Sequence, residues 1–213
     1  SIDGTTSPIA ETVKENTGPV VVVDAGHGGE DPGKVSNYSS LAEKDLNLRI
    51  AQLLKNLLEQ DGYIVYMTRT EDKLNYSPGT KEIYQKRKQD LTSRKQFIDQ
   101  SGADIAISIH MNSFTDPKYH GAQTFYPPSS IDSERLAMSI QNALIEVCDN
   151  SNKRTALVKK ERIILFRDIK VPTVIVECGF LSNKEEEAKL KTLEYQELIA
   201  KGIKQGIDDF FGK

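Results

Sequence analysis

Val21-Val22-Val23-Asp24-Ala25-Gly26-His27-Gly28-Gly29 is the stretch around which the rest of the chain is organised. Its β-branched run predicts a short buried strand, and the glycines end that strand because glycine alone accepts positive φ without steric cost. His27 is therefore expected on a tight loop at the carboxyl end of a central strand, where open α/β sheets place their ligands. Taken alone, the stretch fits equally well a strand-end turn that contains a histidine by chance.

The composition is that of one globular domain. The chain has 213 residues, of which 38% are hydrophobic and 28% are charged. A net charge of −3 argues against a nucleic-acid partner, and no apolar stretch is long enough to span a bilayer. The first residues show no export signal, which is also what a trimmed chain would show. Cys148 and Cys178 form no metal motif and are expected to be buried thiols rather than a disulfide.

Apolar periodicity divides the chain into a flexible lead-in, residues 1–18, and one α/β domain, residues 19–213. One helix is expected over residues 42–60, with Ser40 as its N-cap and Glu43 completing a capping box. A later helix is expected to begin at Asp132 or Ser133 as its cap. Strands are expected at residues 19–24, 63–68, 104–109, 122–126, 162–166 and 173–177. Strand, helix and strand in alternation predict a mostly parallel sheet flanked by helices.

Three of these strands end in residues that carry chemistry. His27 follows the first, His110 follows the third and Glu177 ends the last. Because the carboxyl ends of parallel strands meet at one edge of a sheet, these side chains are expected to share a pocket. Glu43 joins them if the loop after His27 folds back over that edge.

Two imidazoles and one carboxylate are the ligand set of a catalytic zinc ion, which keeps a fourth position for water and lowers the pKa of that water to about 7. A carboxylate that is not a ligand then accepts the proton of the water, and Glu177 on its rigid strand is the candidate. Each residue also has a structural interpretation. The histidines could be ordinary polar residues, Glu43 a capping residue only, and Glu177 an ion-pair partner of Arg69, Arg94 or Arg167.

The motifs resemble those of the zinc-dependent N-acetylmuramoyl-L-alanine amidases of the amidase-3 family. The resemblance covers residues 19–212, in the family's order. It is carried by Val22-Val23-Asp24-Ala25-Gly26-His27-Gly28-Gly29, Glu43-Lys44-Asp45-Leu46-Asn47-Leu48, Thr68-Arg69, Leu91-Thr92-Ser93-Arg94, Ala103-Asp104-Ile105-Ala106-Ile107-Ser108-Ile109-His110-Met111-Asn112 and Val171-Pro172-Thr173-Val174-Ile175-Val176-Glu177-Cys178-Gly179-Phe180-Leu181-Ser182-Asn183.

The resemblance implies a twisted six-stranded sheet, one zinc ion held by His27, Glu43 and His110, and Glu177 as the catalytic glutamate. It implies cleavage of the amide between the lactyl group of muramic acid and L-alanine in peptidoglycan. Without appended wall-binding repeats, the chain is most similar to the compact sporulation-type amidases. The expected location is therefore outside the cytoplasm, in the cell wall or the intermembrane space of the forespore. Whether an activating or regulatory protein partner is needed stays open.

Some residues have two interpretations. Arg94 is expected either to contact a substrate carboxylate or to form a structural ion pair, and Asp24 to orient a ligand imidazole. The basic cluster of residues 86–88 is expected to be solvated, the alternative being contact with an anionic wall polymer. Residues 28–34 fit the G-x-x-x-x-G-K pattern of a P-loop, but Val35 lacks the hydroxyl that magnesium needs. The other alternative is an inactive amidase-like binding module.

Overall fold

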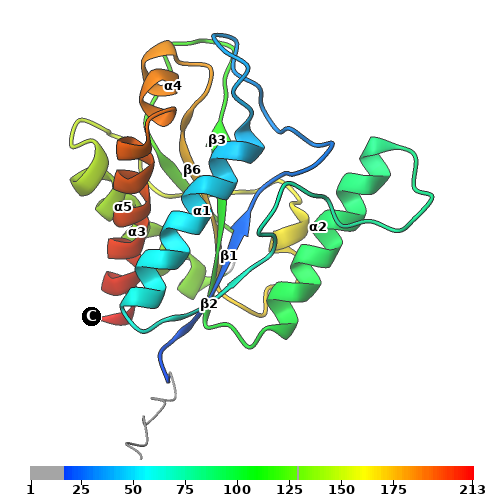
Figure 1. The fold of residues 1–213 in the computed structure, drawn as a ribbon. Coiled ribbons are helices and arrows are strands. Elements are labelled where there is room, and N and C mark those ends of the chain that lie inside the picture. The colour runs from blue at the N-terminus through cyan, green and yellow to red at the C-terminus, as the bar shows by residue number, and fades with distance from the viewer. Residues whose placement is uncertain (1–16, 129) are drawn as a thin grey trace, which may run out of the picture.

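The computed structural model describes residues 17–128 and 130–213, so the predicted lead-in lies almost entirely outside the described residues (Figure 1). Six strands form one sheet in the order β2-β1-β3-β6-β4-β5. The strands are β1 (Val20–Ala25), β2 (Ile64–Met67), β3 (Ile105–Asn112), β4 (Gln123–Tyr126), β5 (Leu157–Val158) and β6 (Thr173–Phe180). All neighbouring strands are parallel except β4 and β6. The predicted six-stranded, mostly parallel sheet is confirmed.

Helices cover both faces of this sheet (Figure 1). They are α1 (Glu43–Gln60), α2 (Ile83–Gln100), α3 (Ile131–Cys148), the 3-10 helix η1 (Ile164–Phe166), α4 (Lys184–Leu190) and α5 (Leu193–Phe211). The helices α1, α3 and α5 pack against one face, and α2 and η1 against the other. Among the described residues, no helix is both long enough and apolar enough to cross a membrane.

Alternate residues of each strand serve the two faces, as the pleat of a strand requires. In β1, Val21, Val23 and Ala25 enter the large core under α1, α3 and α5, whereas Val22 belongs to a small core under α2 and η1. The large core contains many fully buried aliphatic side chains, such as Leu54. The small core leaves room on its face of the sheet for polar residues.

Three local predictions are wrong, two of them helix caps and one a strand. Ser40 does not cap α1: the helix begins after Ala42, and the carbonyl groups of Pro32 and Lys34 accept hydrogen bonds from its first amides. The loop folds back on the helix, so its own backbone takes the place of a capping side chain. The cap of α3 is Ser130, whose hydroxyl accepts from the amide of Ser133.

The predicted strand at residues 162–166 is also wrong. Residues Ile164–Phe166 form η1, which packs against α2 with Leu165 buried between them, and the sixth strand is the short β5 at Leu157–Val158. A short apolar run buries its side chains equally well as a strand or as a turn of helix, so its periodicity did not distinguish the two.

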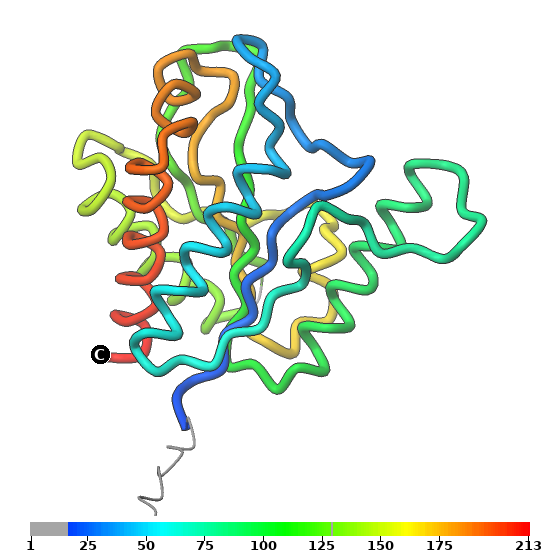
Figure 2. Tube along the Cα trace, in the orientation of Figure 1, coloured from blue at the N-terminus to red at the C-terminus, as the bar shows by residue number. Residues whose placement is uncertain are grey.

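The long loop between β1 and α1 is hydrogen-bonded to the segment around α4. Figure 2 shows it leaving β1 and running toward α4 before it returns to start α1. There the hydroxyls of Ser36 and Ser39 donate to Glu187 of α4, and the Tyr38 hydroxyl donates to the carbonyl of Ser182. These bonds fix the loop, whose first half carries His27 and whose end carries Glu43.

Candidate active site

His110 and Glu177 lie opposite one another on the parallel strands β3 and β6. Residues in register on neighbouring strands point to the same face, and here it is the face covered by α2 and η1. The loop from β1 begins alongside β3, since the amide of Gly26 donates to the carbonyl of Ile109 at 3.1 Å. The predicted convergence of strand ends thus brings His27 to the same edge.

Gly26 is required by close packing. A β-carbon at this position would lie 2.3 Å from Cε1 of His110, inside any tolerable contact distance. His27 itself has a φ of 63°, in the left-handed region that non-glycine residues seldom occupy. The chain turns back directly after His27, where the backbones of Gly28 and Asp31 are hydrogen-bonded to each other. The His27 imidazole faces His110 edge-on, with the ring centroids 5.0 Å apart.

Glu43 completes a cluster with the two histidines. Its Oε1 lies 3.2 Å from Nε2 of His27 and 3.0 Å from Nδ1 of His110, and the side chain is 6% exposed. Backbone amides orient the carboxylate further: Met111 donates to Oε1 and Lys34 donates to Oε2. One ligand atom of each of the three residues lies within 4.8 Å of the others. Two imidazole nitrogens and one carboxylate oxygen at this spacing suit a metal ion.

Asp31 orients the first of these ligands. Its Oδ2 lies 2.7 Å from Nδ1 of His27, which places the ring proton on Nδ1 and leaves Nε2 directed at the cluster. Sequence reasoning assigned this task to Asp24, and that prediction is wrong. Asp31 stands four residues after His27, and the turn between Gly28 and Asp31 brings the two side chains together.

The carboxylates make the cluster a strong site for positive charge. Burial lowers the pKa of His27, but its hydrogen bonds to Asp31 and Glu43 outweigh burial and raise that pKa to about 9. For Glu43, burial raises the pKa, and the hydrogen bonds from His110 and His27 together lower it well below its ordinary value. A proton or a metal ion at the imidazoles is thus stabilised by the same two carboxylates.

Glu177 is in a different state from Glu43. Its Oε2 is buried and has no hydrogen-bond partner within the described residues. Burial raises the pKa of Glu177, and the charges of His110 and Lys159 oppose that rise. A buried carboxylate oxygen without a partner is costly, and such groups are typical of catalytic positions.

None of the arginines suggested as ion-pair partners of Glu177 pairs with it in the described residues. The Arg69 guanidinium donates to four backbone carbonyl oxygens, which belong to Ala25, Gly26, Lys44 and Glu71. Within the described residues Arg167 forms no ion pair.

Arg94 forms the structural ion pair that was one of its two interpretations. Its guanidinium donates to Asp90 at 2.7 Å, to Asp24 at 2.9 Å and to the carbonyl groups of Ala25 and His27. Asp24 accepts in addition from the hydroxyls of Thr68 and Ser108. This buried network fixes the end of β1 and the backbone of His27, so Arg94 acts through positioning.

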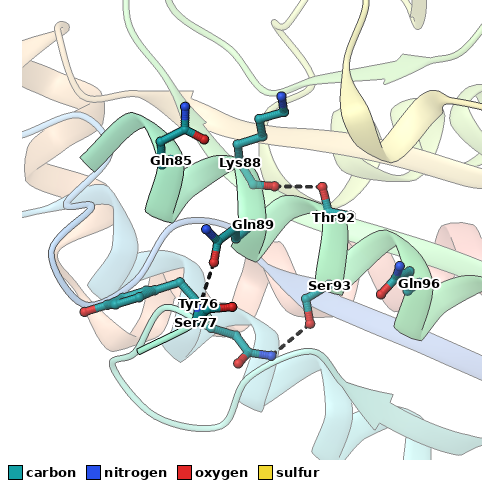
Figure 3. A pocket seen from close by; sticks show the side chains of 9 residues that line it. Tyr76, Ser77, Gln85, Lys88, Gln89, Thr92, Ser93 and Gln96 are labelled. Atoms are coloured by element: carbon teal, nitrogen blue, oxygen red, sulfur yellow. Dashed lines mark hydrogen bonds between the residues drawn. The ribbon is translucent and has the colours of Figure 1, made fainter. Parts of the chain in front are cut away.

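A cavity of about 500 Å³ opens over the cluster. His27, His110 and Glu177 line it, together with apolar side chains from α2, β6 and the segment around η1. A second groove, shown in Figure 3, lies on another side of α2 and is lined by amide and hydroxyl side chains such as Gln85, Gln89 and Ser93. None of the predicted site residues lines that second groove.

Neither cysteine lines the cavity, and of the basic cluster only Arg87 does. Both cysteines are free thiols, as expected; Cys178 is buried in the large core, whereas Cys148 is only partly buried. In the basic cluster, Lys86 pairs with Glu30 and Arg87 with Asp31.

The P-loop alternative is excluded by the shape of the loop. The amides of Gly28, Gly33 and Lys34 are bonded to acceptors of the protein itself, and α1 does not begin until Glu43. No cradle of free amides at a helix N-terminus is present in the described residues for a phosphate to occupy.

Two histidines and one carboxylate form a cluster at the carboxyl ends of the strands, and a separate buried carboxylate lies beside it. This arrangement in an α/β domain is typical of a metal-dependent hydrolase. The model of the N-acetylmuramoyl-L-alanine amidase family Amidase_3 matches residues 21–209. The chain belongs to this family, as its motifs predicted.

Relatives share most of the chain. A germination-specific N-acetylmuramoyl-L-alanine amidase of Bacillus subtilis is 34% identical over 92% of this chain and 81% of its own length. Among solved structures, the CwlD amidase from Clostridioides difficile, in complex with the GerS lipoprotein, is 41% identical with a TM-score of 0.88, over 91% of this chain and 98% of that one. An N-acetylmuramoyl-L-alanine amidase from Clostridium difficile 630 is 31% identical with a TM-score of 0.79, over 92% of this chain and 98% of that one.

Proposed function

We propose that this chain is a zinc-dependent peptidoglycan amidase that cleaves the bond between the lactyl group of muramic acid and L-alanine. The observation that carries the proposal is the contrast between two buried glutamates at one sheet edge. Glu43 is bonded to both imidazoles, whereas Glu177 faces the same cavity with an unpartnered oxygen. One glutamate is thus arranged as a ligand and the other as a base.

His27, Glu43 and His110 are the residues that would hold the zinc ion. A zinc ion held there would act as a Lewis acid toward the amide carbonyl and would lower the pKa of a bound water molecule to about 7. Two imidazoles with one carboxylate are the ligand set of known catalytic zinc sites, and they leave a coordination position open. Asp31 keeps Nε2 of His27 free for this task.

Glu177 acts as the general base and then as the general acid. It takes a proton from the attacking water and passes it to the nitrogen of L-alanine as the amide bond breaks. Burial, which raises the pKa of Glu177, strengthens it as the base that takes the proton of the water. Its strand position opposite His110 holds the carboxylate against the reacting atoms without help from a mobile loop.

The relatives support a more specific role. One is named a germination-specific amidase, and another was solved in complex with a lipoprotein. We therefore propose that this amidase acts outside the cytoplasm on spore-cortex peptidoglycan, and that a protein partner regulates its activity. Export and anchoring would be provided by segments or partners other than the described residues.

Metal analysis of the purified chain, paired with a peptidoglycan digest, tests the proposal. We expect about one zinc per chain and release of stem peptides with new N-terminal L-alanine, both abolished by a chelator and restored by zinc. A chain that binds peptidoglycan and zinc but releases no stem peptide, alone or with a partner lipoprotein, would instead be an inactive binding module. Activity that persists in chelator would contradict the zinc mechanism.

A further inference from the structure

The cavity over the metal-binding cluster is lined by two chemically different groups of side chains. The reactive group comprises His27, His110 and Glu177. The apolar wall comes from α2, the segment around η1, and β6: Leu91, Ile163, Leu165 and Ile175. A bound molecule therefore meets both the reactive groups and an aliphatic surface, the usual lining of a specific ligand site.

Three cationic side chains line the same cavity, and two of them are neutralised. Arg94 is paired with Asp24 and Asp90, and Arg87 with Asp31 at 2.5 Å. Lys159 is the third. Within the described residues no carboxylate oxygen lies within 4.0 Å of its ammonium group, and that group donates no side-chain hydrogen bond. Its charge is available to a ligand.

The position of Lys159 is fixed by its surroundings. Its backbone amide donates to the carbonyl of Tyr126 at 2.8 Å, which continues the pairing of β5 with β4. Its Nζ lies 4.6 Å from the centroid of the Phe125 ring, a cation–π contact that holds the ammonium group without neutralising it. Lys160, the next residue, is exposed and does not line the cavity, as alternation along an extended segment requires.

The positive charge continues away from the metal-binding cluster. Arg87 and Leu91 also line a neighbouring groove of about 330 Å³ between α2 and η1, distinct from the groove in Figure 3. Lys88 and Arg167 line this groove, and neither forms an ion pair within the described residues. The chain as a whole carries a net charge of −3, so this line of cations is a local feature that favours an anionic chain.

We propose that Lys159 is the receptor for a free carboxylate of the stem peptide, and that the apolar wall packs against the aliphatic part of the same peptide. The proposal rests on the proposed function and names which feature of the substrate that site selects. An ammonium group that is half-buried and unpaired forms a charge-assisted hydrogen bond with a carboxylate, and an amide in the same place forms a weaker one. Lys159 is thus a specificity residue.

Two forms of one substrate test the proposal: purified peptidoglycan with its stem carboxylates free, and the same material with these carboxylates converted to primary amides. The zinc-loaded chain is assayed on both, together with K159M, K159R and the matched control K160M. We expect the wild type to have about tenfold higher kcat/KM on the free-acid form. K159M should lose this preference through KM, K159R should keep most of it, and K160M should match the wild type.

The outcomes separate the two proposals. If the wild type cleaves neither form, alone or with a partner lipoprotein, the proposed function has failed. If it cleaves both forms equally well, the function stands and the role of Lys159 is overturned. If K159M lowers kcat by the same factor on both forms, Lys159 acts on Glu177 and not on the substrate, which also overturns the inference. The preference of the wild type is measured without any variant, so the test survives a K159M chain that fails to fold.

Discussion

The two faces of the sheet are made from alternate residues of the same strands, yet they hold the protein together in different ways. On the face under α1, α3 and α5, aliphatic side chains such as Leu54 and Ile107 are fully buried. On the face under α2 and η1, the small core ends at the buried network of Asp24, Arg94 and Asp90. The network and small-core side chains such as Leu165 line the open cavity together.

This difference shows how the domain accommodates a reactive site. The large core fixes the strands by close packing, so the opposite face can carry unpaired polar groups and a cavity. Glu177 and Cys178 are neighbours on β6 and illustrate the division: one faces the cavity and the other is fully buried in the large core. The following changes test whether chemistry depends on one face and stability on both.

The largest effect is expected from Glu177→Gln. Loss of a general base lowers kcat by about 10²- to 10⁴-fold, whereas zinc content should be unchanged because Glu177 is not in the metal-binding cluster. The measurements are peptidoglycan hydrolysis and metal analysis of the same preparation. A fully active variant would remove Glu177 from the mechanism, and loss of zinc would make it a ligand.

Arg94→Met and Leu54→Ala compare the two faces directly. Removing Arg94 leaves Asp24 and Asp90 buried without their partner and should cost about 3–5 kcal/mol of unfolding free energy. Leu54→Ala should cost about 2–5 kcal/mol through a cavity in the large core. Urea unfolding measures both. In the folded proteins only Arg94→Met should also lower activity, since Arg94 holds the carbonyl of His27. Equal activity in the two variants would contradict that positioning role.

Asp31→Asn should weaken metal binding about 10- to 100-fold, because the carboxylate that orients the imidazole of His27 is lost. The natural control is Arg87→Met, which removes the other partner of Asp31 and leaves its bond to His27. Competition with a chromogenic chelator gives both affinities. If the two variants bind zinc equally well, Asp31 has no role in orienting the ligand.

A smaller effect on the free energy of unfolding is expected when the pH is lowered. Burial raises the pKa of Asp24, but the ion pair with Arg94 and the hydrogen bonds from Ser108 and Thr68 bring it below its ordinary value of 3.8. A pKa that is lower in the folded state contributes stability above pH 3.8 that is lost as the pH falls through the folded-state value. Unfolding free energy should therefore decline only in strong acid. In Arg94→Met the decline should begin at higher pH, and an unchanged profile would argue against the ion pair.

Most of the site could be predicted from the sequence because it lies at strand ends. The valine run, the strand before His110 and the strand before Glu177 are short apolar segments with clear boundaries, and parallel strands bring their carboxyl ends together. Glu43 was less certain, since its place depends on the path of a long loop. The structure brings it to the two histidines through bonds from the amides of Lys34 and Met111.

What could not be predicted depends on contacts between distant segments. Ser40 has the right spacing for a helix cap, but carbonyl groups from Pro32 and Lys34 occupy that position. Asp31 and Lys159 gain their roles from a reversed backbone and from a two-residue strand, neither of which leaves a periodic pattern. Local spacing reports which residues share a strand or a helix face, and it says little about how loops pack.

The left-handed backbone at His27 restricts how this site could change in evolution. A φ of 63° costs of order 1–3 kcal/mol for most residues, and is tolerated best by glycine, asparagine, aspartate and histidine. Homologues that have lost metal binding are therefore expected to carry asparagine, aspartate or glycine at position 27, and not valine or isoleucine. Descendants that kept the fold but lost the chemistry would be recognisable by that one residue, even where the rest of the motif had drifted.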